Sequence, residues 1–112
     1  MKVTTFGLDL AKWVFQLHWV EMDTGEICRR QLKRHQVAEF FAKRQPSVVA
    51  MEVCGSAHYW ARKLQAMGHE VRLIAAQFVR PFVKSNKTDV ADAQAIWESR
   101  AATGNEVRSG EE

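Results

Sequence analysis

The chain lacks the features that mark secreted, zinc-bound and membrane-spanning proteins. It has only two cysteines, Cys28 and Cys54, and their spacing matches no zinc-binding pattern. Two unpaired thiols are typical of a reducing compartment rather than of a disulfide-stabilised secreted domain. No apolar run approaches the ~18 residues that a membrane span needs, and the N-terminus has no signal-peptide core. We therefore expect a cytoplasmic protein that does not enter a membrane.

Proline and glycine are also scarce, with 2 and 6 residues, so the chain is not a linker or a low-complexity segment. Hydrophobic residues make up 46% of it, which is enough to fill the interior of one folded domain of 112 residues. Acidic residues are in slight deficit, because 13 Asp and Glu face 16 Lys and Arg, for a net charge of +3. A positive balance favours a polyanionic partner such as nucleic acid.

The first part of the chain predicts an antiparallel meander. Residues 2–9 and 13–20 are rich in apolar, β-branched and aromatic types, which favour β-strands. Residues 23–26, Asp-Thr-Gly-Glu, are a turn signal, so residues 27–32 would form the returning strand of a hairpin. Short connections between consecutive strands place them side by side in one sheet.

The rest of the chain predicts alternating helices and strands. We expect helices over 36–44, 57–67 and 88–102 and strands over 47–52 and 69–75. Residues 76–84 stay open, because Pro81 interrupts any helix there. The order βββαβαβα predicts an α/β domain over residues 1–102, with a mixed five-stranded sheet and helices on its faces. Residues 103–112 are expected to be a polar flexible tail.

Four carboxylates fall where predicted strands end or a predicted helix begins. Asp9 and Glu52 each close an apolar run, and Asp89 and Asp92 stand three residues apart at the start of the last helix. An acid at the tip of a buried strand is costly unless a cation meets it. The spacing of Asp89 and Asp92 puts both on one helix face. If the two strands are neighbours and the helix packs on their ends, all four carboxylates meet.

Four clustered carboxylates require a hard divalent cation to neutralise them, and Mg²⁺ or Mn²⁺ suits such oxygen ligands. Two ions about 3.5–4 Å apart would activate water and stabilise the leaving oxygen of a phosphodiester. The alternative for Asp89 and Asp92 is that they complement the dipole of their helix. The residues alone leave both readings open.

Basic residues gather in two stretches. The second stretch directly precedes the acid pair, so we expect it to contact phosphate, whereas the first could equally be a solvated surface. The first contains Arg29, Arg30, Lys33, Arg34, Lys43 and Arg44, and the second contains Arg80, Lys84 and Lys87.

Three segments, residues 7–12 (GLDLAK), 51–60 (MEVCGSAHYW) and 84–93 (KSNKTDVADA), carry a resemblance to a known family. They resemble, in the same order, the N-terminal domain of the DEDD insertion-sequence transposases. That family includes the Piv-type DNA invertases and some bridge-RNA-guided recombinases. The resemblance covers residues 3–102 and implies a RuvC-like, RNase H-like fold. It also implies catalytic acids that bind Mg²⁺, at Asp9, Glu52, Asp89 and Asp92.

The same resemblance implies a DNA transposase that cleaves phosphodiesters and transfers DNA strands. It also implies DNA as a partner, a homo-oligomer and, as in some members of the family, a structured guide RNA. The family carries a second domain with a nucleophilic serine, to which nothing before Glu112 corresponds. We therefore expect half of a composite active site; the alternative is a non-catalytic nucleic-acid-binding or dimerisation module. The expected nucleic-acid contacts are Lys12, Arg80, Lys84, Ser85 and Lys87.

Other residues have simpler interpretations. Ser56 is predicted to cap a helix, Tyr59 and Trp60 to pack in the core, and Trp97 to lie either in the core or at an interface. Gly7-Leu8-Asp9 also opens actin-like ATPases, but no glycine-rich phosphate loop follows. The histidines have no metal-ligand spacing and are expected at the surface or in hydrogen bonds: His18, His35, His58 and His69.

Overall fold

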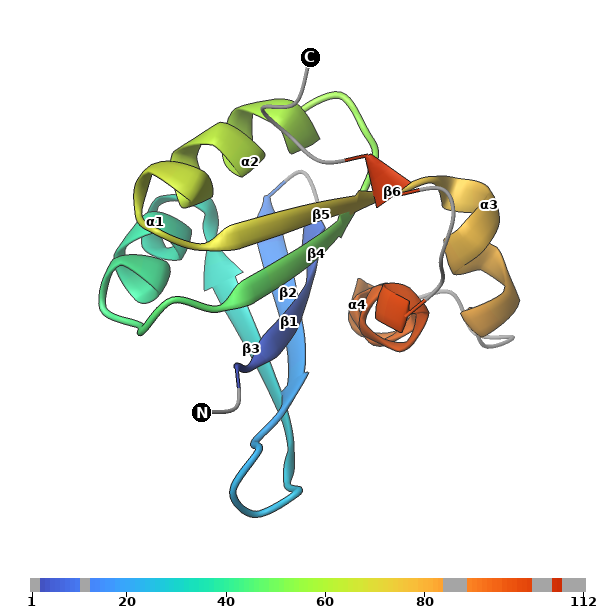
Figure 1. The fold of residues 1–112 in the computed structure, drawn as a ribbon. Helices are drawn as coiled ribbons and strands as arrows, with labels where there is room; N and C mark the ends of the chain where they lie inside the picture. The colour runs from blue at the N-terminus through green and yellow to red at the C-terminus, as the bar shows by residue number, and fades with distance from the viewer. Residues whose placement is uncertain (1–2, 11–12, 84–88, 102–105, 108–112) are drawn as a thin grey trace.

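A mixed β-sheet runs through the protein, with helices on both of its faces (Figure 1). The computed structural model describes residues 3–10, 13–83, 89–101 and 106–107, and for 89–92, 101 and 106–107 it describes the backbone alone. The strands are β1 (Thr5–Leu10), β2 (Val14–Val20), β3 (Ile27–Lys33), β4 (Val48–Glu52), β5 (Glu70–Ile74) and β6 (Glu106–Val107).

The strand order is β3-β2-β1-β4-β5-β6. The meander β1-β2-β3 is antiparallel, whereas β4 runs parallel to both β1 and β5. This confirms the predicted mixed sheet and its first five strands. The two-residue strand β6 pairs antiparallel with β5 at the sheet edge and was not predicted.

The helices lie in two layers. One face of the sheet carries α1 (Arg34–Ala42) and α2 (Ala57–Ala66), and the other carries α3 (Ala76–Val79), η1 (Arg80–Phe82), α4 (Asp89–Glu98) and η2 (Ser99–Ala101). The three predicted helices are confirmed. The segment left open is α3 followed by η1, whose first turn accommodates Pro81 because that position needs no backbone N–H bond. No helix in the described part of the chain is long and apolar enough to cross a bilayer.

Each sheet face has its own apolar cluster, since side chains alternate along a strand. Phe6 and Leu8 of β1 pack under α1 and α2, together with Val49 and Met51 of β4. Ala50 of β4 packs on the other side, against α3 and α4. Burial on both faces explains why β4 is a continuous apolar run.

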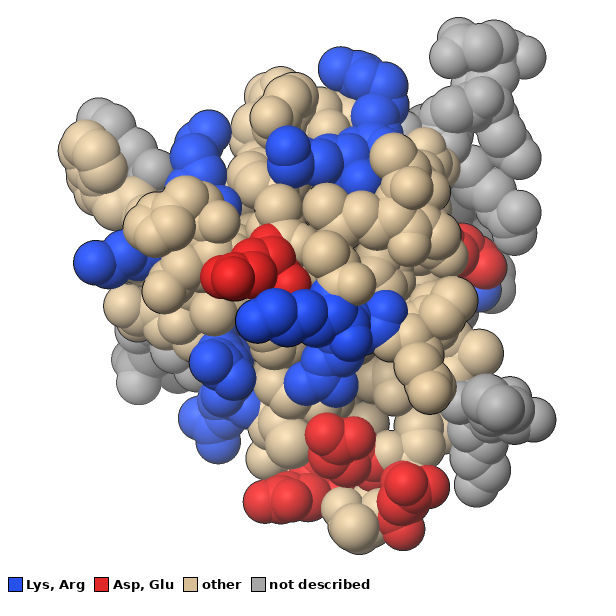
Figure 2. All heavy atoms as spheres, turned by 90° about the vertical axis from the view of Figure 1, so that its left-hand side faces the viewer, with Lys and Arg blue, Asp and Glu red and all other residues tan. Residues whose placement is uncertain are grey.

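Lysines and arginines gather on the face formed by α1 and β3, and a separate group of acidic side chains lies at its lower end (Figure 2). The acidic group belongs to the turn between β2 and β3, which Figure 1 shows at the bottom of the molecule. Its members are Glu21, Asp23 and Glu26. The two charges therefore occupy different parts of this surface.

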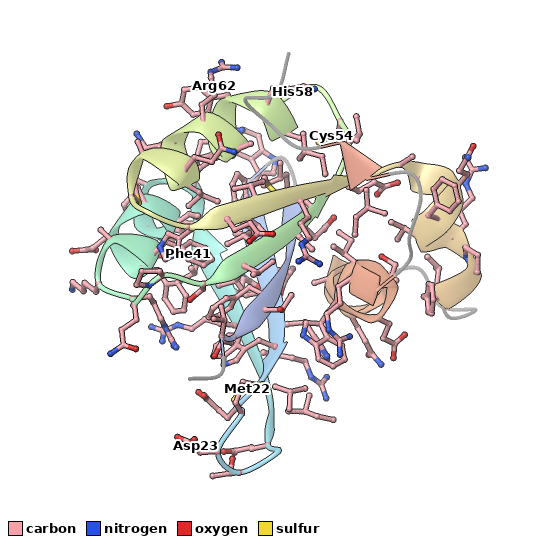
Figure 3. All side chains as sticks on the ribbon, in the orientation of Figure 1. Met22, Asp23, Phe41, Cys54, His58 and Arg62 are labelled. Carbon is pink, nitrogen blue, oxygen red and sulfur yellow. The ribbon has the colours of Figure 1, made fainter. Side chains whose placement is uncertain are left out.

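Two expectations for α2 need correction. Trp60 is buried as predicted, but Tyr59 is 52% exposed, because only one side of α2 meets the sheet. His58 and Arg62 also point outward from α2, whereas Phe41 of α1 is enclosed (Figure 3). Ser56 stands at the predicted N-cap position, yet its side chain makes no capping hydrogen bond.

Candidate active site at the ends of β1 and β4

Asp9 and Glu52 lie at the same level on neighbouring strands. The parallel register of β1 and β4 pairs Thr5 with Val48 and continues to Leu8 with Met51. One further step along both strands brings Asp9 beside Glu52, and neighbouring strands are about 4.8 Å apart. Both residues are half-buried. The fold thus brings together two carboxylates that are far apart in sequence.

Both acids project toward the face that α4 covers. Gly7, two residues before Asp9, lies directly beneath α4: a Cβ atom at position 7 would be 2.6 Å from the Ala93 carbonyl oxygen. Ala50, two residues before Glu52, packs with α4 as well. Side chains two residues apart on a strand share a face, so Asp9 and Glu52 face the α4 side.

The contact at Gly7 also locates the first turn of α4. Asp92 immediately precedes Ala93 in the chain. Asp89 lies about one helical turn before Ala93, a distance of about 6 Å along the helix axis. Trp97, one turn after Ala93, donates its Nε1–H to the Thr5 carbonyl oxygen at 2.9 Å. These contacts favour an α4 whose first turn lies on the side of Gly7 where β1 ends at Asp9 and Leu10.

The four-acid site itself stays a prediction. Among the side chains that the structure describes, no three His, Cys, Asp or Glu residues lie close enough together to hold a metal ion. The side chains of Asp89 and Asp92 lie outside that description. What the fold supplies is a pair of carboxylates under a helix that begins at Asp89.

A polar row continues from Asp9 across the sheet. Gln16 of β2 is paired with Asp9, and its Nε2–H donates to Oε1 of Gln31 in β3 at 3.0 Å. Gln16 is 6% exposed, so it is a buried polar residue on the candidate site's face. Gln16 was not among the expected site residues, although a glutamine in the apolar run of β2 was a visible signal.

His18 departs from the position expected for it. It is paired with Gly7, is buried against the Trp97 ring at 5.4 Å between centroids, and its Nδ1 has no hydrogen-bond partner among the described residues. Burial is the main cause that lowers the pKa of His18 below its ordinary value of 6.5. The positive charges of Arg29 and Arg100 also lower this pKa, whereas the negative charge of Glu98 raises it. The expectation of a surface or hydrogen-bonded histidine is therefore wrong for the Nδ1 side of His18.

His69 meets that expectation in its hydrogen-bonded form. Its Nδ1 accepts from the Ser47 backbone N–H at 3.0 Å, and its Nε2 lies 2.7 Å from the Phe41 carbonyl oxygen. These partners fit a neutral ring with the proton on Nε2. His69 thus links β5, the start of β4 and the end of α1, and its role is structural.

The expected nucleic-acid contacts are only partly visible. Arg80 is exposed in η1, on the sheet face that also carries α4. The other expected contacts, Lys12, Lys84, Ser85 and Lys87, lie outside the described residues. Their phosphate role therefore stays a prediction.

Known proteins support the expectation from the motifs. The chain is 59% identical over 99 residues to a probable family 20 transposase of Pseudomonas aeruginosa. It is 47% identical over 97 residues to the transposase for insertion sequence element IS1328 of Yersinia enterocolitica. The chain resembles insertion-sequence transposases. The matches cover 88% and 87% of this chain but 29% of each relative, so the chain spans under a third of their length.

The likeness to solved structures concerns the fold. The chain superposes on RuvC of T. thermophilus, solved in complex with a Holliday junction substrate, with a TM-score of 0.61 and 14% identity. The match covers 95% of this chain and 100% of that one. This confirms the expected RuvC-like fold. No family model matches the chain.

Proposed function

We propose that this domain is the metal-dependent nuclease part of an insertion-sequence transposase and that it acts on DNA phosphodiesters. The observation that carries the proposal is the meeting of Asp9 and Glu52 under a helix whose first turn contains Asp89 and Asp92. The names of the relatives and the RuvC-like fold support it.

The residues fit a divalent metal. Carboxylate oxygens are the ligands that Mg²⁺ and Mn²⁺ prefer, and Gly7 leaves room for α4 to approach the strand ends closely. Asp9 and Glu52 would hold the metal from the sheet, with Asp89 and Asp92 from the helix. Bound as a pair, the ions would activate water and stabilise the leaving oxygen.

Around that site the chain's own residues have distinct tasks. Asp9 and Glu52, fixed on adjacent strands, present their carboxylates at a set separation. Gln16, held by its hydrogen bond to Gln31, keeps the neighbouring position polar and ordered. Trp97 anchors α4 on β1 and so fixes the helix that carries the remaining two acids.

Strand transfer, self-association and guide-RNA binding are further proposals taken from the family that the chain resembles. In that family a nucleophilic serine of another domain completes the site. We propose that this domain supplies the acidic half of such a composite site. Light scattering of the purified chain and its binding to a structured RNA test the oligomer and the guide RNA separately.

Metal binding separates this proposal from the alternative of a non-catalytic binding module. Mn²⁺ titration followed by electron paramagnetic resonance should show binding at millimolar metal or below. Asp9→Asn and Glu52→Gln should each weaken it about tenfold or more, since one charge-assisted contact is worth ~1.5–3 kcal/mol. The matched control Asp23→Asn, at the exposed hairpin tip, should bind like the native chain.

Cleavage of linear and branched DNA in Mn²⁺ then tests the chemistry. Metal-dependent cleavage that disappears in Asp9→Asn supports a nuclease. A native chain that binds DNA but takes up no Mn²⁺ at millimolar concentration would instead establish the binding module.

A further inference from the structure

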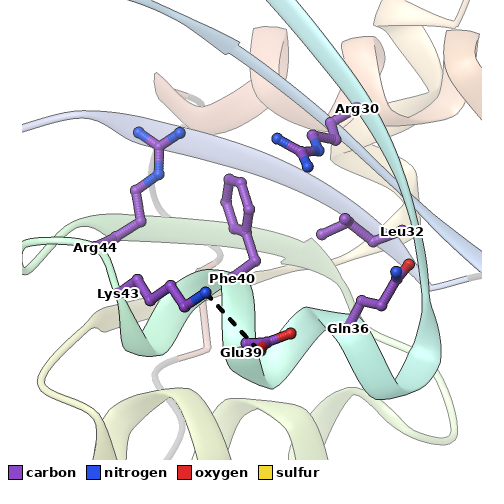
Figure 4. Close-up of a pocket in the computed structure, with 7 residues that line it drawn as sticks. All are labelled: Arg30, Leu32, Gln36, Glu39, Phe40, Lys43 and Arg44. Carbon is purple, nitrogen blue, oxygen red and sulfur yellow. Dashed lines mark ion pairs between the residues drawn. The ribbon is translucent and has the colours of Figure 1, made fainter.

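A pocket of about 280 Å³ lies between β3 and α1, on the sheet face opposite α4 (Figure 4). Its lining combines cations with an aromatic ring. The lining residues are Arg30, Leu32, Gln36, Glu39, Phe40, Lys43 and Arg44. The first basic stretch of the sequence therefore converges, in part, on one concave site.

Phe40 organises the two arginines. The Arg44 guanidinium carbon is 4.7 Å from the centroid of the Phe40 ring, and that of Arg30 is 5.6 Å from it. Arg44 also lies 5.3 Å from each of the Phe6 and Trp19 rings. An aromatic face restrains a guanidinium without using its in-plane N–H donors. Both arginines are thus pre-oriented while their donors remain available to an anion.

The charges of the pocket are not balanced within it. Glu39 is the one carboxylate in the lining, against three cations, and it pairs with Lys43 at 3.8 Å on the exposed surface (Figure 4). Neither Arg30 nor Arg44 has a carboxylate oxygen within 4.0 Å in the part of the chain that the structure describes. The acidic side chains of the β2–β3 turn lie at the lower end of this face, below the gathered lysines and arginines (Figure 2).

The cationic surface extends beyond a single anion. Arg34, exposed in the first turn of α1, lies on the same sheet face as the pocket, with its guanidinium carbon 5.6 Å from the centroid of the Phe15 ring. From Arg30 to Arg34 the chain spans four residue steps, about 13 Å at the rise of a β-strand. Duplex DNA carries one phosphate charge per ~1.7 Å of axis, so a surface of this length meets several phosphates. A free phosphate or a single carboxylate would use only the pocket.

We propose that this pocket binds a backbone phosphate of duplex DNA, as an anchoring site separate from the acids. Arg44 lies over Phe6, on the sheet face opposite the one toward which Asp9 projects. The site needs no metal and goes beyond the proposed nuclease function. It holds a DNA segment away from the carboxylates and supplies affinity without cleavage.

The test is duplex binding by fluorescence anisotropy in EDTA, over a range of salt concentrations. Arg30→Gln combined with Arg44→Gln should weaken binding about tenfold or more. It should also reduce the slope of log K against log salt by about 1–2. Arg62→Gln, an exposed arginine on α2, is the matched control and should leave both quantities unchanged.

Glu39→Gln protects the test against a folding defect. Removing the one carboxylate of the pocket should tighten DNA binding, a gain that unfolding cannot produce. Because EDTA removes divalent metal, the measured binding does not depend on the metal site, so failure of the nuclease proposal would not affect this result. The proposal is overturned if the folded double variant binds duplex DNA normally, or if its loss appears with RNA and not with DNA.

Discussion

Adding one methyl group at Gly7 should separate α4 from the sheet. The new Cβ atom would lie 2.6 Å from the Ala93 carbonyl oxygen, 2.7 Å from the Trp97 backbone nitrogen and 2.8 Å from the Trp97 Cβ. Favourable carbon contacts begin near 3.5 Å, so the helix must retreat by about 1 Å. All of the nearest atoms belong to α4, and two are backbone, so no flexible side chain can simply swing aside.

The retreat has two costs. Overpacking of a tight site destabilises by about 1–3 kcal/mol, and loosening the bond from Trp97 to the Thr5 carbonyl oxygen adds ~1 kcal/mol. For a domain of this size, a total of ~2–4 kcal/mol lowers Tm by roughly 10 °C or more. Alanine is better suited than glycine to a strand interior, so backbone propensity opposes this loss.

Thermal unfolding followed by circular dichroism measures the effect. The control is Gly55→Ala, since a Cβ at Gly55 meets nothing within 4 Å. Folded Gly7→Ala should also bind Mn²⁺ more weakly than Gly55→Ala, because its helix no longer lies on the strand ends. If the two variants had the same Tm and the same Mn²⁺ affinity, close approach of α4 at Gly7 would not be what positions the site.

Three further outcomes follow from buried contacts. Trp97→Phe should cost about 1 kcal/mol in urea unfolding, through loss of its hydrogen bond to Thr5; an unchanged midpoint contradicts this. His69→Ala leaves the buried Ser47 N–H and the buried Phe41 carbonyl without their hydrogen-bond partner. The free energy of unfolding should therefore fall by ~2–4 kcal/mol, and a smaller fall than that of Trp97→Phe would contradict this prediction. Because the pKa of His18 is lower in the folded protein than in the unfolded chain, the unfolded chain takes up a proton at His18 at a higher pH than the folded protein does. Falling pH therefore favours unfolding, and the free energy of unfolding should decrease as the pH drops below about 6.5. His18→Gln should flatten that dependence, and an NMR titration of His18 at or above its ordinary pKa would rule out this cause.

Much of the fold is readable from sequence because its elements have strong local signals. The β4 run is apolar throughout since both its faces are covered, and Pro46 and Gly68 mark the neighbouring element ends. β6 has no such signal: it is two residues long, and its pairing with β5 comes from the fold rather than from its own composition.

The candidate site is readable only in part. The strand-end positions of Asp9 and Glu52 follow from the apolar runs that precede them, but their shared level depends on the register of β1 and β4. That register is a long-range property. The same holds for His18 against Trp97 and for Arg44 over Phe6 and Trp19, since nothing local to these residues predicts contacts with distant parts of the chain.

The central claim is that two strand ends and one helix start form a single metal site. A crystal of the chain soaked in Mn²⁺ and measured for anomalous scattering tests it most directly. We predict anomalous density within about 2.0–2.3 Å of carboxylate oxygens of Asp9 and Glu52, with Asp89 and Asp92 completing the shell. Density at other residues, or none between Asp9 and Glu52 at millimolar Mn²⁺, would contradict the account.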